Sequence, residues 1–243
     1  MLVKQAANVV ELLEFFARHR QPATMAEISD MLNWPRSSTF NLVGTLAEKG
    51  YLYEPRGRGG YYPSPRWMST VRAVADADPL PVALIEAVAS IQARTGETTA
   101  VGQATGTHVI FVHVCESEQP IRYFAQIGTR VPIHASSAGR AILSHYSRRE
   151  REAIYRRIAF TDYSSTTPMS IDAVEAELEE AIQLGYHQSN SEFIPDLAGV
   201  ALPLTLDHRK LSIVVAGPTS RCLQRRPETA SIIKEELAAS GLA

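Results

Sequence analysis

Side chains that could read DNA bases or hold phosphates gather on one side of a predicted helix in the first third of the chain. Asn41 could bind adenine through two hydrogen bonds, and Phe40 could contact a thymine methyl group. Arg36 and Ser38 could donate hydrogen bonds to phosphates. Gly44 on the same side would let a phosphate strand approach closely, although a tolerated surface glycine explains it equally well. These residue types predict a helix that enters the major groove.

The signals for this helix are local. Pro35 fits a first helical position, where its missing N–H costs nothing, and Gly50 fits the left-handed residue that ends a helix. A period of 3.6 residues puts four residues on a core-facing side: Thr39, Leu42, Val43 and Leu46. The opposite side carries Ser37, Phe40, Asn41, Gly44 and Glu48.

A basic hairpin follows the helix. Two short aromatic runs, at residues 51–53 and 61–62, flank a Gly-rich turn that contains Arg56 and Arg58. A helix followed by a basic hairpin is typical of a winged helix-turn-helix, in which the wing reaches phosphates or the minor groove. The candidate DNA-binding residues are therefore Arg36, Ser37, Ser38, Phe40, Asn41, Gly44, Arg56 and Arg58.

A second polar segment, VPIHASSAGR, spans residues 131–140. Small residues and hydroxyls where a loop enters a helix leave backbone N–H groups free, and such groups can hold a carboxylate. An ordinary helix cap by Ser136 or Ser137, with His134 hydrogen-bonded locally, explains the same residues. Taken alone, the residues favour the ordinary cap.

Two other chemistries compete for the histidines. His134 close to Ser136 suggests a small hydrolase, but the sequence has no G-x-S-x-G elbow, and adjacency is not a nucleophile–base geometry. His113 and Cys115, with His108 nearby, suggest a metal-responsive regulator, but a metal site needs three or four ligands. A half-buried strand explains them as well. We expect no catalytic residues, no metal and no cofactor.

Three predicted helices position the DNA-reading residues. The first spans residues 6–18, with an apolar stripe from Val9 to Phe16. Thr24 and Glu27 form a capping box that opens the second helix. Residues 33–35 make the tight turn before the third. The order of helix, capped helix, turn, helix and basic hairpin predicts a winged helix-turn-helix.

A linker separates this domain from the rest. Ser64-Pro65 breaks the chain, and residues 66–77 predict a helix in which Met68, Val71, Val74 and Ala75 recur at helical spacing. We expect a winged helix-turn-helix domain at residues 1–63, a linker helix at 64–80 and a second domain at 81–243.

The second domain interleaves helices and strands, so we predict an α+β fold. A first helix, residues 82–94, buries Leu84, Ile85, Val88 and Ile91. The predicted strands span residues 97–104, 108–115, 121–127, 200–206 and 211–216, with Tyr123 and Phe124 in the sheet core. The remaining predicted helices span residues 136–146, 148–158, 171–184 and 227–239.

Composition sets outer limits. The 243 residues carry a net charge of −2, but residues 1–72 hold nine Lys and Arg against six Asp and Glu, so only the front of the chain attracts phosphate. No apolar run approaches the roughly 20 residues of a membrane span, and no signal segment opens the chain, so we expect a cytoplasmic protein. Cys115 and Cys222 are expected to be buried, reduced thiols.

Four segments in order behind the predicted winged helix resemble one protein family. They are PIHASSAGRAIL, LGYHQSNSEF, GVALPLT and VVAGPTSR, and PRSSTFNLVGTLAEKGYL resembles the recognition segment of the same family. The family is the IclR family of bacterial transcriptional regulators. The resemblance covers nearly the whole chain and implies a winged helix-turn-helix, a linker helix and a C-terminal GAF-like α/β effector domain. It also implies homodimers, often paired into homotetramers, on palindromic double-stranded operators.

The resemblance also implies an effector pocket for small organic acids or aromatic compounds. Its lining would comprise Ser137, Ala138, Gly139, Ser189, Leu197, Gly199, Val214 and Ala216. Some acid-binding relatives have hydroxyls where this chain has Val214 and Ala216, and an acidic residue where it has Ser189. We therefore expect a larger or more apolar effector, an aromatic acid or a neutral compound.

The recognition helix departs from many relatives too. Asn41 stands where Arg is common and Phe40 where a polar residue is common, so we predict an A·T step at the centre of each half-site. The sequence as a whole predicts a ligand-responsive transcriptional regulator and not an enzyme. A metal-responsive regulator and a small hydrolase are the alternatives.

Overall fold

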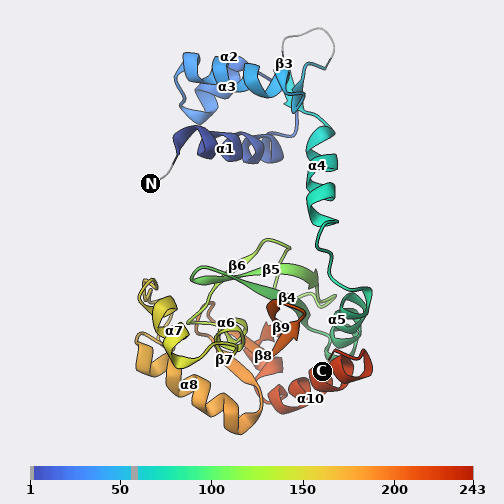
Figure 1. Cartoon of the computed structure of the whole chain (residues 1–243), viewed down its shortest axis with the longest axis vertical. Coiled ribbons are helices and arrows are strands. Elements are labelled where there is room, and N and C mark those ends of the chain that lie inside the picture. Colours follow the sequence, from blue (N-terminus) through green and yellow to red (C-terminus); the bar gives the residue numbers. More distant parts are fainter. Residues whose placement is uncertain (1–2, 56–59, 243) are drawn as a thin grey trace. The chain divides into compact units, whose positions relative to one another are not determined.

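In the computed structural model, which describes residues 3–55 and 60–242, the chain divides into two compact units (Figure 1). The N-terminal unit comprises residues 1–79 and the C-terminal unit residues 80–243. Among the described residues, no helix is long and apolar enough to cross a membrane.

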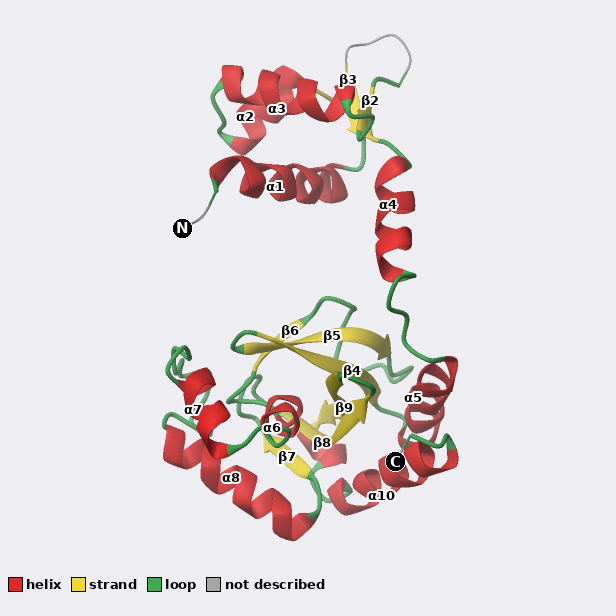
Figure 2. Ribbon diagram, viewed as in Figure 1, coloured by secondary structure: helices red, strands yellow, loops and turns green. Residues whose placement is uncertain are grey.

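The N-terminal unit packs three helices against a small sheet (Figure 2). Its elements are α1 (Lys4–His19), β1 (Ala23–Thr24), α2 (Met25–Leu32), α3 (Arg36–Glu48), β2 (Leu52–Tyr53), β3 (Gly60–Pro63) and α4 (Arg66–Ala75). The strands are antiparallel in the order β1-β3-β2. The winged helix-turn-helix order is therefore as predicted, whereas β1 was not predicted because a two-residue strand has no periodicity to detect.

Local signals fix the helix-turn-helix. The predicted capping box is present: Glu27 N–H donates to Thr24 Oγ1 at 3.2 Å, and Thr24 N–H donates to the Glu27 carboxylate at 2.8 Å. Pro35 does not occupy the first helical position as predicted but precedes it, because its ψ of 136° is extended. Gly50 has the predicted left-handed backbone, with φ of 76°. The core of this unit is made of Leu12, Phe15, Phe16, Ala23, Ile28, Trp34, Val43 and Leu52.

Trp67 ties the start of α4 to the hairpin. Its indole N–H donates to Tyr51 O at 2.9 Å, and the two rings lie 4.5 Å apart. Beyond this anchor, Met68, Val71 and Val74 are exposed, so the apolar stripe of α4 has no cover within its own unit.

The C-terminal unit is built on one six-stranded antiparallel sheet in the order β6-β5-β4-β9-β8-β7. The strands are β4 (Thr98–Thr105), β5 (His108–Cys115), β6 (Arg130–Pro132), β7 (His187–Asn190), β8 (Leu197–Leu206) and β9 (Arg209–Pro218). The helices are α5 (Val82–Thr95), α6 (Ser137–Leu143), α7 (Arg148–Tyr155), α8 (Ile171–Leu184), α9 (Thr219–Cys222) and α10 (Arg226–Ala239).

Helices cover both faces of this sheet (Figure 1). On one face α5 and α10 bury Leu84, Ile91 and Ile233 against strand residues such as Val215. On the other face α6, α7 and α8 pack against the adjacent, preceding residue of the same strand, Val214. Successive side chains of a strand point to opposite faces, so both cores follow from the alternation within β8 and β9. The predicted α+β fold is confirmed.

Several predictions for this unit were wrong. Residues 121–127 are not a strand: Ile121, Phe124 and Ile127 are exposed, and only alternate residues such as Tyr123 turn inward. The edge strand that pairs with β5 is instead β6, which is too short to produce an alternating pattern in the sequence. Ile85 was predicted to be buried but is 38% exposed, because the stripe of α5 that faces the sheet passes beside it.

The thiols are less buried than predicted. Cys115 and Cys222 are both free and half-buried. Burial, with the nearby Glu97 carboxylate, raises the pKa of Cys222 to about 12, so this thiol is a poor nucleophile.

Candidate functional site

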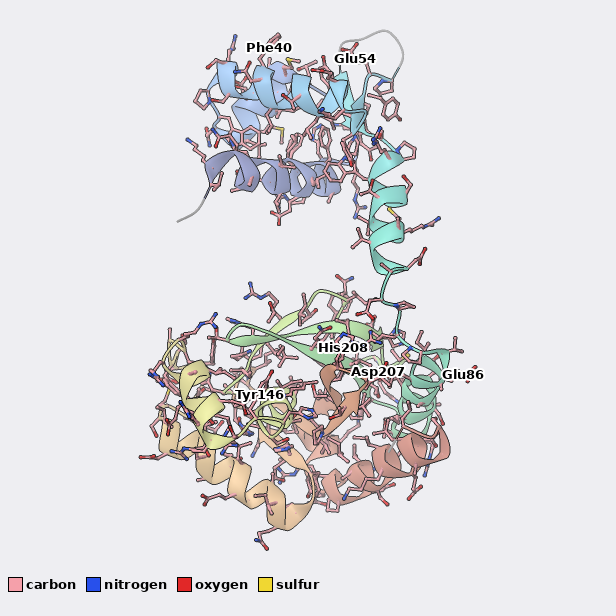
Figure 3. The ribbon with its side chains drawn as sticks, in the orientation of Figure 1. Phe40, Glu54, Glu86, Tyr146, Asp207 and His208 are labelled. Atoms are coloured by element: carbon pink, nitrogen blue, oxygen red, sulfur yellow. The ribbon has the colours of Figure 1, made fainter. Side chains whose placement is uncertain are left out.

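The first candidate site is the exposed face of α3. Thr39 and Val43 are fully buried, while Ser37, Asn41 and Phe40 are exposed, as the periodicity predicted. Phe40 is 63% exposed and lies on the outer side of the helix (Figure 3). At this position the aromatic ring is free to contact another molecule.

The remaining DNA-binding candidates fall in three places. Arg36 and Ser38 are exposed in the first turn of α3. A Cβ built on Gly44 meets no atom within 4 Å, so nothing inside the unit requires glycine there. Arg56 and Arg58 lie outside the described residues. The hairpin that leads to them is paired in the register Leu52↔Pro63 and Tyr53↔Tyr62.

The second candidate site is a cavity in the C-terminal unit with about 400 Å³ of empty space, its opening to solvent included. It is lined by Phe111, Tyr123, Val131, Ala135, Ser136, Ser137, Ala138, Ser189, Glu192, Phe193, Ile194, Leu197, Gly199, Val214 and Ala216. The structure thus brings together seven of the eight residues predicted as effector-binding, and Gly139 is the exception.

Strand register explains the floor of this cavity. Ser189 on β7 pairs with Gly199 on β8, which pairs with Ala216 on β9, so the three side-chain positions lie in a row. Ser189 Oγ donates to Ser137 Oγ at 3.4 Å. A Cβ on Gly199 would lie 2.6 Å from Ser137 Oγ, so glycine keeps room for this hydroxyl pair.

Gly139 supports the cavity from behind instead of lining it. A Cβ built there would lie 2.1 Å from Ile133 O, so only glycine lets α6 approach the chain that leads into it. Ser136 caps α6: its Oγ accepts from Gly139 N–H at 3.1 Å and donates to Pro132 O at 2.7 Å. For Ser136, the ordinary cap is therefore the correct explanation.

Sequence reasoning missed the aromatic wall and the one acid among the described residues that line the cavity. Phe111 comes from β5, Tyr123 from the segment predicted as a strand, and Phe193 and Glu192 from the loop after β7. Burial raises the pKa of Tyr123 to about 12, so its phenol stays protonated. The alternation of β5 could have assigned Phe111 to this face, but the other three carry no local signal.

Glu192 is held by a fully buried arginine. Arg140 donates from Nη1 to Glu192 Oε2 at 2.6 Å and from Nη2 to Oε1 at 2.8 Å. It also donates to His134 O at 3.2 Å and to Gln188 O, and it lies 3.6 Å from Glu177. Burial opposes the charge, but the carboxylates of Glu192, Glu177 and Glu180 outweigh it and raise the pKa of Arg140. The pair therefore joins the pocket wall to α6 and β7.

The geometry gives the two alternative chemistries little support. His134 is buried, its ring 5.1 Å from that of Phe160, and burial lowers its pKa. The Ser136 hydroxyl is already used by the cap. His113 Nε2 lies 3.8 Å from Cys115 Sγ, but the described part of the chain has no cluster of three His, Cys, Asp or Glu arranged to hold a metal.

Comparison with known proteins gives concordant results. Residues 82–240 match the sequence profile "Bacterial transcriptional regulator IclR C-terminal", and residues 5–56 match "IclR helix-turn-helix domain". The chain is 25% identical over 220 residues to the HTH-type transcriptional repressor AllR of Escherichia coli, covering 89% of this chain and 81% of AllR. It is also 25% identical over 225 residues to the HTH-type transcriptional regulator KipR of Bacillus subtilis, covering 92% of this chain and 89% of KipR.

A solved structure has the same fold. The crystal structure of the Thermotoga maritima IclR superposes with a TM-score of 0.80 at 20% identity, covering 98% of this chain and 97% of that one.

Proposed function

Because the chain belongs to the IclR family of bacterial transcriptional regulators, we propose that its N-terminal unit binds a palindromic operator and that its C-terminal cavity binds the small organic effector that controls this binding. The observation that carries the proposal is the presence, in one chain, of an exposed face on the third helix of a helix-turn-helix and of a separate lined cavity.

DNA binding is assigned to α3 and the wing. Asn41 is proposed to read a base and Phe40 a thymine methyl group, while Arg36, Ser38, Arg56 and Arg58 hold phosphates. Ser37 and Gly44 face the same groove. The buried contacts of Thr39 and Val43 support this orientation, because they fix which side of α3 is free.

We propose that the regulator acts as a homodimer or a dimer of dimers. A palindromic operator is read by two heads in successive major grooves, about one helical turn apart or a multiple of it. The exposed Met68, Val71 and Val74 of α4 support pairing, because a second copy could cover them. An effector changes the spacing of the heads only through its different affinities for the two states.

The effector is proposed to be an aromatic acid or a neutral aromatic compound, and the neutral compound fits better. Three aromatic rings line the cavity, and Ser137 with Ser189 offers hydroxyls to one polar group. Among the lining residues that the structure describes, Glu192 is the one charged at neutral pH, and Arg140 already neutralises it. A carboxylate ligand would meet that acid without a lining cation to balance it.

A binding assay with labelled duplexes from the chain's own genomic neighbourhood tests the function. Affinity would be measured over a range of salt concentrations, with and without small catabolites. We expect salt-sensitive retention of at least one palindromic duplex and a change in affinity with an aromatic compound. Retention of no duplex would end the proposal. A response to metal that a chelator abolishes, or turnover of the compound, would favour the alternative functions.

Asn41→Ala tests base reading. We expect the loss of preference at one base pair of each half-site, worth about 1–3 kcal/mol, because the amide's two hydrogen bonds to an adenine are lost. Operator variants carrying each base pair at the half-site centre would be titrated against both proteins. An unchanged preference would remove Asn41 from base reading.

A further inference from the structure

The first turns of α1 and the free side of α3 enclose a polar groove, which we call the α1–α3 groove. It is lined by Lys4, Gln5, Asn8, Ser38, Asn41, Leu42 and Thr45. Six of these seven side chains are polar, one is cationic, and within the described chain none is acidic. The groove has about 810 Å³ of empty space, its open side included.

The position of the groove on α3 decides what can occupy it. Ser38, Asn41 and Thr45 are three, then four residues apart, so they form one stripe along the helix. Asn41 lies near the middle of the exposed face, and the other two lie on the flank that adjoins α1. The groove is therefore the edge of the face assigned to base reading.

A helix in the major groove has phosphates on both flanks. With side chains an α-helix is about 10–12 Å across, and the major groove is about 12 Å wide, so neither flank is far from a strand. Whichever strand runs along the Ser38 flank passes the start of α1. Because this step takes α3 as the DNA-reading helix, it rests on the proposed function.

The chemistry of the lining suits a sugar–phosphate strand. Lys4 offers three donors and Gln5 and Asn8 offer amide donors, whereas phosphate oxygens only accept. Thr45 Oγ1 already donates to Asn41 O at 2.7 Å, and Leu42 is the one apolar side chain among the described lining residues. We propose that the α1–α3 groove seats one operator strand, with Lys4 against a phosphate and Gln5 and Asn8 as neutral donors beside it.

These contacts do not depend on base sequence. They fix the register of α3 in the major groove, and Lys4 adds one ion pair to the electrostatic part of the affinity. Lys4→Ala should therefore weaken binding to operator and random DNA by similar factors, unlike Asn41→Ala.

Fluorescence anisotropy tests the proposal. A random-sequence duplex of about 30 base pairs would be titrated with the full chain at KCl concentrations between about 50 and 300 mM. We expect Lys4→Ala to lower the slope of log affinity against log salt by about 1. The double variant Gln5→Ala/Asn8→Ala should weaken binding several-fold at every salt concentration and leave the slope unchanged. Lys4 is exposed, so folding is unaffected, and a thermal melt checks this.

Arg18→Ala is the matched control. Arg18 is exposed on the same helix, and its replacement removes the same single positive charge. It lies about 21 Å further along α1, which exceeds the Debye length of about 10 Å at 0.1 M salt. Its slope should equal that of the wild type. Equal losses in Lys4→Ala and Arg18→Ala, or no loss in either, would overturn the groove assignment while DNA binding stands. A wild type without salt-sensitive binding would overturn the proposed function itself.

Discussion

Replacing Glu192 by alanine is expected to lower the free energy of unfolding of the C-terminal unit by about 3–5 kcal/mol, because it leaves a buried guanidinium without its carboxylate. Arg140 is fully buried, and Glu192 accepts two charge-assisted hydrogen bonds from its guanidinium. Glu177 remains at 3.6 Å, but it is more exposed and makes no bidentate contact. For a unit of this size the thermal midpoint should fall by about 6–20 °C.

Comparing single and double variants separates the contribution of the Arg140–Glu192 ion pair to stability from that of the packing around it. Arg140→Met combined with Glu192→Leu removes both charges and keeps most of the volume, so its loss should be clearly smaller than that of Glu192→Ala. The full chain would be unfolded with denaturant and followed by two signals. Fluorescence of Trp34 and Trp67 reports only the N-terminal unit, whereas circular dichroism reports both units, so the transition seen only by circular dichroism belongs to the C-terminal unit. A loss below about 1 kcal/mol for Glu192→Ala would mean that water already solvates the pair.

The parts of the fold that the sequence predicted well are those with local causes. Helix α8 begins and ends as predicted, because the Ser170 side chain caps its start and Gly185 ends it with φ of 73°. The capping box of Thr24 and Glu27 is equally local. The strand prediction for residues 121–127 failed because alternating apolar residues also suit a loop that packs one side against the sheet. This loop lies against the start of β4, where Thr98 Oγ1 donates to Tyr123 O at 2.6 Å.

The same distinction separates the parts of the cavity that the sequence could predict from those that it could not. Its floor was predictable because the resemblance supplied Ser137, Ser189 and Gly199, which strand register then brings together. Its walls were not, because contacts such as that between Arg140 and Glu192 join residues 52 positions apart. A sequence pattern reports which residues share a face, whereas a pocket depends on which faces meet.

Ala216→Leu is expected to lower effector affinity at least 100-fold, about 2.7 kcal/mol, while DNA binding without effector stays unchanged. Ala216 lines the cavity in the row formed with Gly199 and Ser189, so three added carbons enter the space that a ligand must fill. Overpacking a filled core costs about 1–3 kcal/mol, but here open space receives the side chain, so the loss of stability should stay below that. Isothermal titration with the compound that gives the largest thermal shift measures the affinity.

Ala216→Ser is the control that distinguishes volume from polarity. It adds one hydroxyl and little volume, so a neutral aromatic effector should bind within a few-fold of the wild type. If the serine variant instead gained affinity for a carboxylate, the apolar residue at position 216 would be what excludes acids from this cavity. If the leucine variant kept full effector affinity, the effector would bind elsewhere, because a ligand cannot share this row of side chains with a leucine.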